Sequence, residues 1–189
     1  RWMDGRKSKD QRIKGSKARL SRNYYLPCFH TERMSVAPLE QALAGLLTPN
    51  NVVIKQSRRY LFQMLKTPNS ILGLMNRVDS KQNNNAGTRQ VSAVLLRKVI
   101  NKHWGKLDNP TRQNIQNALL HMITQEPEVL VRRALGAVIA RLSKHLLPGW
   151  SQMLELINAC ASQQDSRFRE QAYLLLYQSA EPIGRTLES

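Results

Sequence analysis

Cysteines, aromatic residues and acidic residues are all scarce in this sequence. Its 189 residues include two cysteines, Cys28 and Cys160, and only 6% Phe, Trp and Tyr. Two distant cysteines do not make a disulfide framework, which favours a reducing compartment. Thirteen Asp and Glu stand against twenty-nine Lys and Arg, so the net charge is +16. This excess favours nucleic acid, anionic lipid or acidic protein surfaces as partners, without choosing among them.

The sequence also lacks the features that catalysis, metal binding and membrane insertion require. No apolar run approaches the ~18 residues of a membrane span, and there is no glycine-rich phosphate loop. The four histidines are scattered, and neither cysteine has a base partner nearby in the sequence. Cys28 and His30 offer two metal ligands, but no second pair lies at metal-site spacing. We therefore expect no enzyme, no cofactor, no metal site and no membrane partner.

Basic charge is concentrated in residues 1–33, which differ from the rest of the chain. Ten of the Lys and Arg and three of the Asp and Glu lie there, so this segment carries +7 and residues 34–189 carry +9. Its few apolar residues can bury little surface, so we expect disorder. Three interpretations compete: a basic tail for nucleic-acid binding or nuclear targeting, a mitochondrial presequence, or an upstream stretch outside the true protein. We favour the third, because a plausible folded domain begins directly after Met34.

From Pro38 onward, apolar residues recur at helical spacing, and no segment alternates like a strand over a useful length. Prolines and polar loops divide this part into paired helices. The expected helices cover residues 38–47, 52–66, 69–78, 88–104, 111–125, 128–144, 150–162 and a last one from 165. We expect residues 34–189 to form one domain of four helix pairs, at about 37–67, 69–105, 109–146 and 149–184.

The second helix of each pair begins in the same way. A polar or acidic residue is followed by two spacers, a mostly apolar residue and a base, in residues 51–55, 85–89, 128–132 and 165–169. The first residue suits a helix N-terminus, and the base can reach a neighbouring repeat and form a ladder. Successive bases lie 34, 43 and 37 residues apart, a period typical of α-solenoids. The pattern predicts an all-α fold, a right-handed α-solenoid of about four repeats.

The helix expected at 128–144 has two unlike faces. Its apolar arc contains Leu130, Val131, Ala134, Leu135, Val138 and Leu142. Its opposite arc contains Arg132, Arg133, Gly136, Ala140, Ser143 and Lys144. This second arc is basic at both ends and nearly flat in the middle, because the small residues project little side chain. Such a face suits the docking of a partner.

Three segments resemble a known family. Residues 131–142, Val-Arg-Arg-Ala-Leu-Gly-Ala-Val-Ile-Ala-Arg-Leu, resemble the second helix of a HEAT repeat. Residues 88–107 are similar to the N-terminal importin-β domain, in which an Arg-Gln-x-x-Ala-x-x-Leu-x-(Arg/Lys) helix ends in Trp-x-x-Leu. Residues 39–47 resemble the opening helix of that family. The resemblance covers about residues 35–184, and its nearest branch is the importin-four type of karyopherin-β.

The resemblance implies a nuclear transport receptor that moves between cytoplasm and nucleus through the pore of the nuclear envelope. Such receptors bind import cargo, here histones or ribosomal proteins, and contact Phe-Gly nucleoporins. They release cargo when GTP-bound Ran engages the second helices of their N-terminal repeats. The expected Ran-facing residues are Lys55, Arg58, Arg59, Gln90, Arg97, Lys98, Asn101, Arg133, Ser143 and Lys144. The expected ladder residues are Lys55, Arg89, Arg132 and Arg169, and Trp104 is expected in the core.

The sequence departs from this family in two ways, and its charge allows an alternative function. The family has many more repeats than four, so we expect this chain to be a fragment or a truncated product. Residues 1–33 have no counterpart in the family. The alternative to a receptor is a basic helical-repeat scaffold that binds RNA, DNA or acidic protein surfaces. The charge supports the scaffold, whereas the helix ending at Trp104, in its repeat context, supports the receptor.

Overall fold

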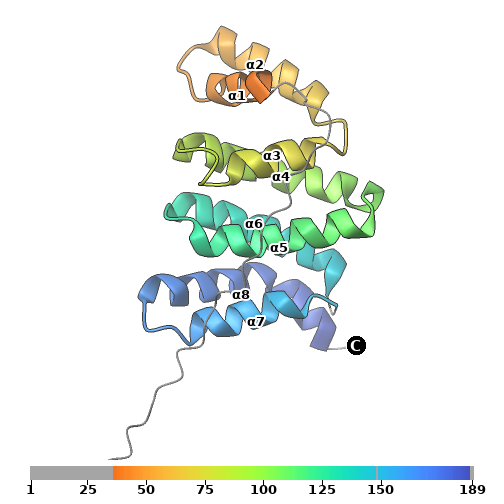
Figure 1. Cartoon of the computed structure of the whole chain (residues 1–189), viewed down its shortest axis with the longest axis vertical. Helices are drawn as coiled ribbons and strands as arrows, with labels where there is room; N and C mark the ends of the chain where they lie inside the picture. The colour runs from red at the N-terminus through yellow and green to blue at the C-terminus, as the bar shows by residue number, and fades with distance from the viewer. Residues whose placement is uncertain (1–35, 148, 188–189) are drawn as a thin grey trace, which may run out of the picture.

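The computed structural model describes residues 36–147 and 149–187, and all regular structure in these two ranges is helical. The elements are α1 (Val36–Gly45), α2 (Asn51–Met64), α3 (Ser70–Val78), α4 (Ala86–His103), the 3-10 turn η1 (Trp104–Lys106), α5 (Asn109–Gln125), α6 (Val129–Leu146), α7 (Ser151–Ala161) and α8 (Ser166–Leu187). The eight α-helices of these ranges form four consecutive pairs, and Figure 1 shows the pairs stacked one on another, which confirms the all-α prediction. None of these helices is long and apolar enough to cross a membrane. The boundary expected after residue 33 and the pair Cys28 and His30 lie outside the described residues.

The starts of the second helices, α2, α4, α6 and α8, follow the predicted pattern with two corrections. Asn85 caps α4 as expected, because its Oδ1 accepts a backbone N–H bond. The cap of α2 is Asn50 rather than Asn51. The side chain of Glu128 makes no cap bond at α6. Instead, Glu126 Oε1 accepts a hydrogen bond from the N–H of Glu128 at 2.9 Å. The carboxylate that bonds to the backbone before α6 therefore lies two residues earlier than predicted.

At the starts of α4, α6 and α8, the basic residue of the pattern bonds to the loop that precedes its own helix. In each case Nη1 donates to the carbonyl six residues earlier: Arg89 to Asn83 (2.9 Å), Arg132 to Glu126 (3.0 Å) and Arg169 to Gln163 (2.9 Å). Only Arg89 also joins two repeats, through two bonds to the Glu126 carboxylate, Nε to Oε2 at 3.0 Å and Nη2 to Oε1 at 2.8 Å. The ladder is therefore confirmed at Arg89, whereas Arg132 and Arg169 bond within their own repeats. Lys55 is exposed on α2.

The second helices of the last three pairs pack side by side, α4 against α6 and α6 against α8. The first pair is attached differently: α2 packs on α1, which in turn contacts α3 and α4. The core residues expected on α4 are buried, namely Ala93, Leu96, Ile100 and Trp104. Leu130, expected on the apolar arc of α6, is instead 58% exposed, although the next residue, Val131, is 1% exposed.

The flat arc of α6 is not a free surface, which corrects the expectation of a docking face there. Gly136, Ala140 and Ser143 are all buried. A Cβ added to Gly136 would lie 2.7 Å from Gln178 Oε1 and 3.6 Å from Leu174 Cδ2, both on α8. The small residues therefore let α8 approach α6 closely, and what they accommodate is the next repeat of this chain.

Candidate partner-binding groove

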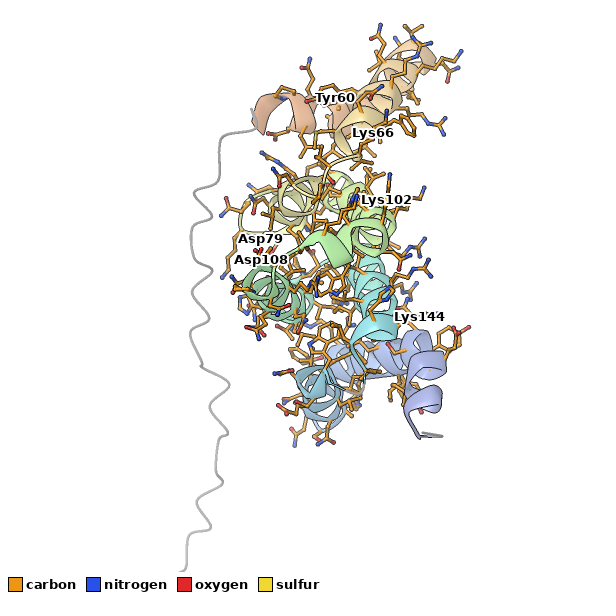
Figure 2. All side chains as sticks on the ribbon, turned by 90° about the vertical axis from the view of Figure 1, so that its right-hand side faces the viewer. Tyr60, Lys66, Asp79, Lys102, Asp108 and Lys144 are labelled. Atoms are coloured by element: carbon orange, nitrogen blue, oxygen red, sulfur yellow. The ribbon has the colours of Figure 1, made fainter. Side chains whose placement is uncertain are left out.

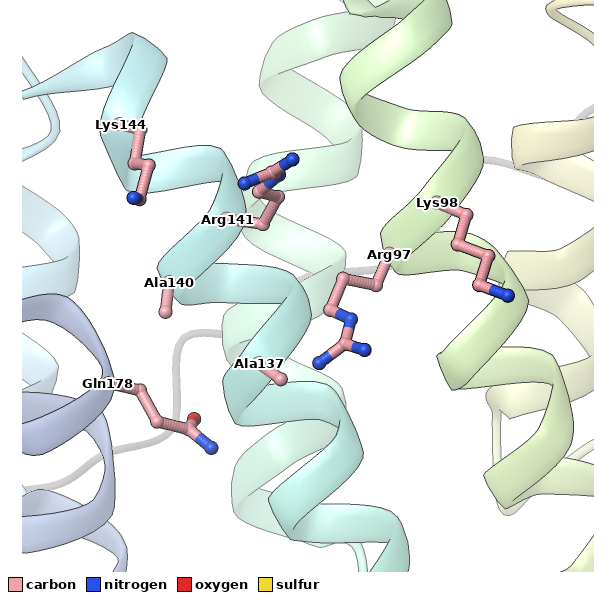
Figure 3. A pocket seen from close by; sticks show the side chains of 7 residues that line it. All are labelled: Arg97, Lys98, Ala137, Ala140, Arg141, Lys144 and Gln178. Carbon is pink, nitrogen blue, oxygen red and sulfur yellow. The ribbon is translucent and has the colours of Figure 1, made fainter.

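A groove of about 590 Å³ opens between α4, α6 and α8. Its lining consists of Arg97 and Lys98 from α4, Ala137, Ala140, Arg141 and Lys144 from α6, and Gln178 from α8. Figure 3 shows Arg97 reaching from α4 toward α6, and Gln178 reaching from α8 toward α6. Four cationic side chains and no carboxylate line this groove, so it is suited to a ligand with negative charge.

The wider surface has the same polarity. Figure 2 places Lys66, Lys102 and Lys144, which lie at or just past the ends of α2, α4 and α6, along one side of the stack. Asp79 and Asp108, which belong to the connections between helices, lie on the opposite side. Basic residues at the ends of α2, α4 and α6 therefore share one side of the stack.

Three of the predicted Ran-facing residues, Arg97, Lys98 and Lys144, come together in this groove. Arg141, which is not among the residues predicted from the sequence, joins them. A signal for it existed, because Arg89 and Arg132 are equivalent and lie 43 residues apart, and the same interval takes Lys98 to Arg141. Aligning the repeats residue by residue would have found it.

Two predicted residues on α6 are already paired with glutamates of α8. Arg133 Nη2 lies 3.4 Å from Glu170 Oε1, and Lys144 Nζ lies 2.5 Å from Glu181 Oε2. Both pairs span 37 residues, so each joins the same position in consecutive repeats. These side chains are partly exposed, and an exposed pair contributes less than about 1 kcal/mol. Arg133 and Lys144 therefore remain open to exchange with a partner.

The corresponding positions on α4 hold neutral side chains. Gln90 is equivalent to Arg133, and Asn101 is equivalent to Lys144. Asn101, another predicted contact, is exposed, and its Oδ1 lies 2.6 Å from His145 Nε2. No described carboxylate forms an ion pair with the cations of α4 that line the groove.

The prediction that Ser143 faces a partner is wrong. It is fully buried, and its Oγ donates to Ala140 O at 2.9 Å. Lys55, Arg58 and Arg59 are exposed on α2, but the lining of the groove includes no residue of α2. The predicted surface therefore divides into the groove and a separate basic patch on α2. Among the residues that the structure describes, no three His, Cys, Asp or Glu gather in a group that could hold a metal ion.

Comparison with known proteins identifies the family. Residues 57–125 match the importin-beta N-terminal domain. The chain is 32% identical over 148 residues to the probable importin subunit beta-4 of Schizosaccharomyces pombe, an alignment that covers 77% of this chain and 14% of that protein. The chain belongs to the importin-β superfamily. Importin-4 of Homo sapiens and of Mus musculus are 30% and 28% identical to it over 144 residues, which are 76% of this chain and 13% of each relative.

The segment of this importin-β family chain that matches the domain contains the Trp104 motif. The Trp104 ring is buried, and the Arg112 guanidinium carbon lies 5.9 Å from its centroid. Arg112 also donates from Nε to Trp104 O at 3.1 Å and from Nη2 to Gly105 O at 3.0 Å. The motif thus fixes the turn between α4 and α5, which confirms the core role expected for Trp104.

Proposed function

We propose that this chain is the Ran-binding part of a nuclear import receptor, and that its second helices contact Ran in its GTP form. The observation that carries the proposal is the basic side of α4 and α6, on which Arg97, Lys98 and Arg141 have no carboxylate partner among the described residues. This side includes α4, which lies within the segment that matches the importin-beta N-terminal domain. An array of fixed cations favours association with an acidic surface and orients it. The proposed role is binding, without catalysis.

The candidate contacts differ in availability. Arg97 and Lys98 are exposed and have no carboxylate partner among the described residues, so we place them at the centre of the contact. Arg133 and Lys144 must exchange Glu170 and Glu181 for groups of the partner, which costs little for exposed pairs. Gln90 and Asn101 supply neutral hydrogen-bonding groups on the same helix. Lys55, Arg58 and Arg59 form a second patch on α2.

The remaining parts of the proposal concern the whole receptor, of which this chain spans only a small share. Its cargo would be nuclear proteins such as histones or ribosomal proteins. It would shuttle between cytoplasm and nucleus by contacting Phe-Gly nucleoporins in the pore of the nuclear envelope.

The test is retention of the intact chain on immobilised Ran loaded with a non-hydrolysable GTP analogue or with GDP. We expect retention on the GTP form alone, and about tenfold weaker binding for Arg97→Ala with Lys98→Ala, which removes two central contacts. The control removes two exposed lysines outside the groove, Lys81→Ala with Lys106→Ala. Equal retention on both nucleotide forms would refute the proposal, and strong salt-dependent RNA binding would then favour the scaffold alternative.

A further inference from the structure

The groove holds more positive charge than the fold neutralises. Two positions recur along the second helices: Gln90, Arg133 and Glu170 are equivalent, and so are Asn101, Lys144 and Glu181. At both positions α4 is neutral, α6 is basic and α8 is acidic. The acids of α8 pair with the bases of α6, but α6 offers no acid to α4. At these two positions, the junction of α4 with α6 therefore lacks the ion pairs that the junction of α6 with α8 has.

Three exposed cations are left over at this junction, namely Arg97, Lys98 and Arg141. None of them forms an ion pair with a carboxylate in the described part of the chain. Ala137, half-buried on α6, also lines the groove, and Figure 3 shows it between Arg97 and Gln178. Its short side chain leaves room for the main chain of a ligand to approach, while the cations reach the side chains of the ligand.

We infer that this groove binds a carboxylate-rich segment of a protein partner, with several Asp or Glu in close succession. The inference goes beyond the proposed function, because it names the chemistry that the groove recognises and holds for whichever protein supplies the segment. The guanidinium of arginine can donate two parallel N–H hydrogen bonds to one carboxylate. Several adjacent carboxylates would replace the charge compensation that α6 does not provide to α4.

One observation favours carboxylates over nucleic acid. None of the residues that line the groove is aromatic. Surfaces that bind single-stranded nucleic acid combine basic charge with aromatic side chains on which the bases stack, and this groove offers only the charge.

The inference is tested by fluorescence anisotropy of a fluorescein-labelled oligoglutamate peptide titrated with the intact 189-residue chain. An oligoglutamine peptide of the same length is the neutral probe. The groove variant is Arg97→Glu with Arg141→Glu, and the matched control is Lys81→Glu with Lys106→Glu. Both pairs reverse two exposed cations and so change the net charge equally. We expect about tenfold weaker oligoglutamate binding for the groove variant and about twofold or less for the control.

The outcomes separate the possibilities. Equal weakening by the two variants, no oligoglutamate binding by the unaltered chain, or equal binding of oligoglutamine would each overturn the inference. A labelled oligouridylate is the nucleic-acid arm, and a larger loss for it than for oligoglutamate in the groove variant would assign the groove to RNA instead. Arg97→Gln with Arg141→Gln repeats the test if circular dichroism shows lost helix in the charge-reversed protein. Ran is absent from this assay, so its result and that of the Ran experiment are independent.

Discussion

The buried pair Arg89 and Glu126 makes the sharpest prediction about what holds the stack together. Both side chains are almost fully buried, with 4% and 2% of their surface exposed. The Glu126 carboxylate accepts two bonds from Arg89 and one from the N–H of Glu128. Glu126→Ala removes all three acceptor contacts and leaves the guanidinium buried, with Asn83 O as its one remaining partner among the described residues.

The expected loss follows from this geometry. Removing one partner of a buried ion pair costs about 3–5 kcal/mol, because the remaining charge is desolvated without compensation. Glu126→Gln keeps the shape and one acceptor oxygen but places an amide N–H₂ near the guanidinium, so we expect about 1–3 kcal/mol. Replacing both partners, Arg89→Met with Glu126→Leu, removes the unpaired charge and is expected to cost less than Glu126→Ala alone.

Urea unfolding followed by far-ultraviolet circular dichroism measures these differences, because urea adds no ionic screening. The control is Arg133→Ala, which breaks the exposed pair with Glu170 and is expected to cost less than about 1 kcal/mol. The reasoning is refuted if Glu126→Ala destabilises no more than Arg133→Ala, or if the double replacement is the least stable of the series.

Three further predictions concern packing, capping and the buried thiol. Gly136→Leu should lower the melting temperature by driving α8 from α6, whereas Gly105→Leu, whose Cβ would meet no atom within 4 Å, should change it little. Hydrogen bonds from Thr111 at the start of α5 hold the pKa of Asp108 below its ordinary value of 3.8, so its capping stabilises the fold above that pH. Asp108→Ala should therefore destabilise at neutral pH, and the difference from the unaltered chain should shrink in unfolding curves as the pH falls below 3.8. Burial raises the pKa of the Cys160 thiol, so in a Cys28→Ser background a disulfide reagent should react with it only as fast as the fold opens.

The helix pairs and much of the core were predictable because their signals are local. Apolar spacing and the prolines located the helices to within a few residues. The capping role of Asn85 follows from the chemistry of a single side chain. Ala93, Leu96 and Trp104 share one arc of α4, and all three are buried. Such signals survive whatever the neighbouring helices do, because the helix fixes which side chains share a face.

What packs against a second helix was not predictable in this way. Gly136 and Ser143 lie on the side of α6 opposite its apolar arc. In an isolated helix, that opposite side would face solvent. In the stack, α6 has its own first helix, α5, beside it and a second helix on each side, α4 and α8. Small side chains opposite the core therefore mark a close helix contact rather than an open docking face. His103 shows the same limit, because its burial and its contact with Leu65 O at 3.1 Å depend on the preceding repeat.

The candidate groove arises from a difference between repeats rather than from any one helix. The net charge of the chain gives the amount of uncompensated charge but not its location. Arg133 and Lys144 meet carboxylates because the positions 37 residues further on are Glu170 and Glu181. Arg97 and Lys98 of α4 do not, because the equivalent positions on α6, 43 residues further on, hold Ala140 and Arg141. If this difference determines binding, moving the acids should move the site. Arg133→Glu with Lys144→Glu should place one carboxylate in the lining of the groove and one beside it, and so abolish oligoglutamate binding. Unchanged binding by that variant would contradict a binding site determined by uncompensated charge.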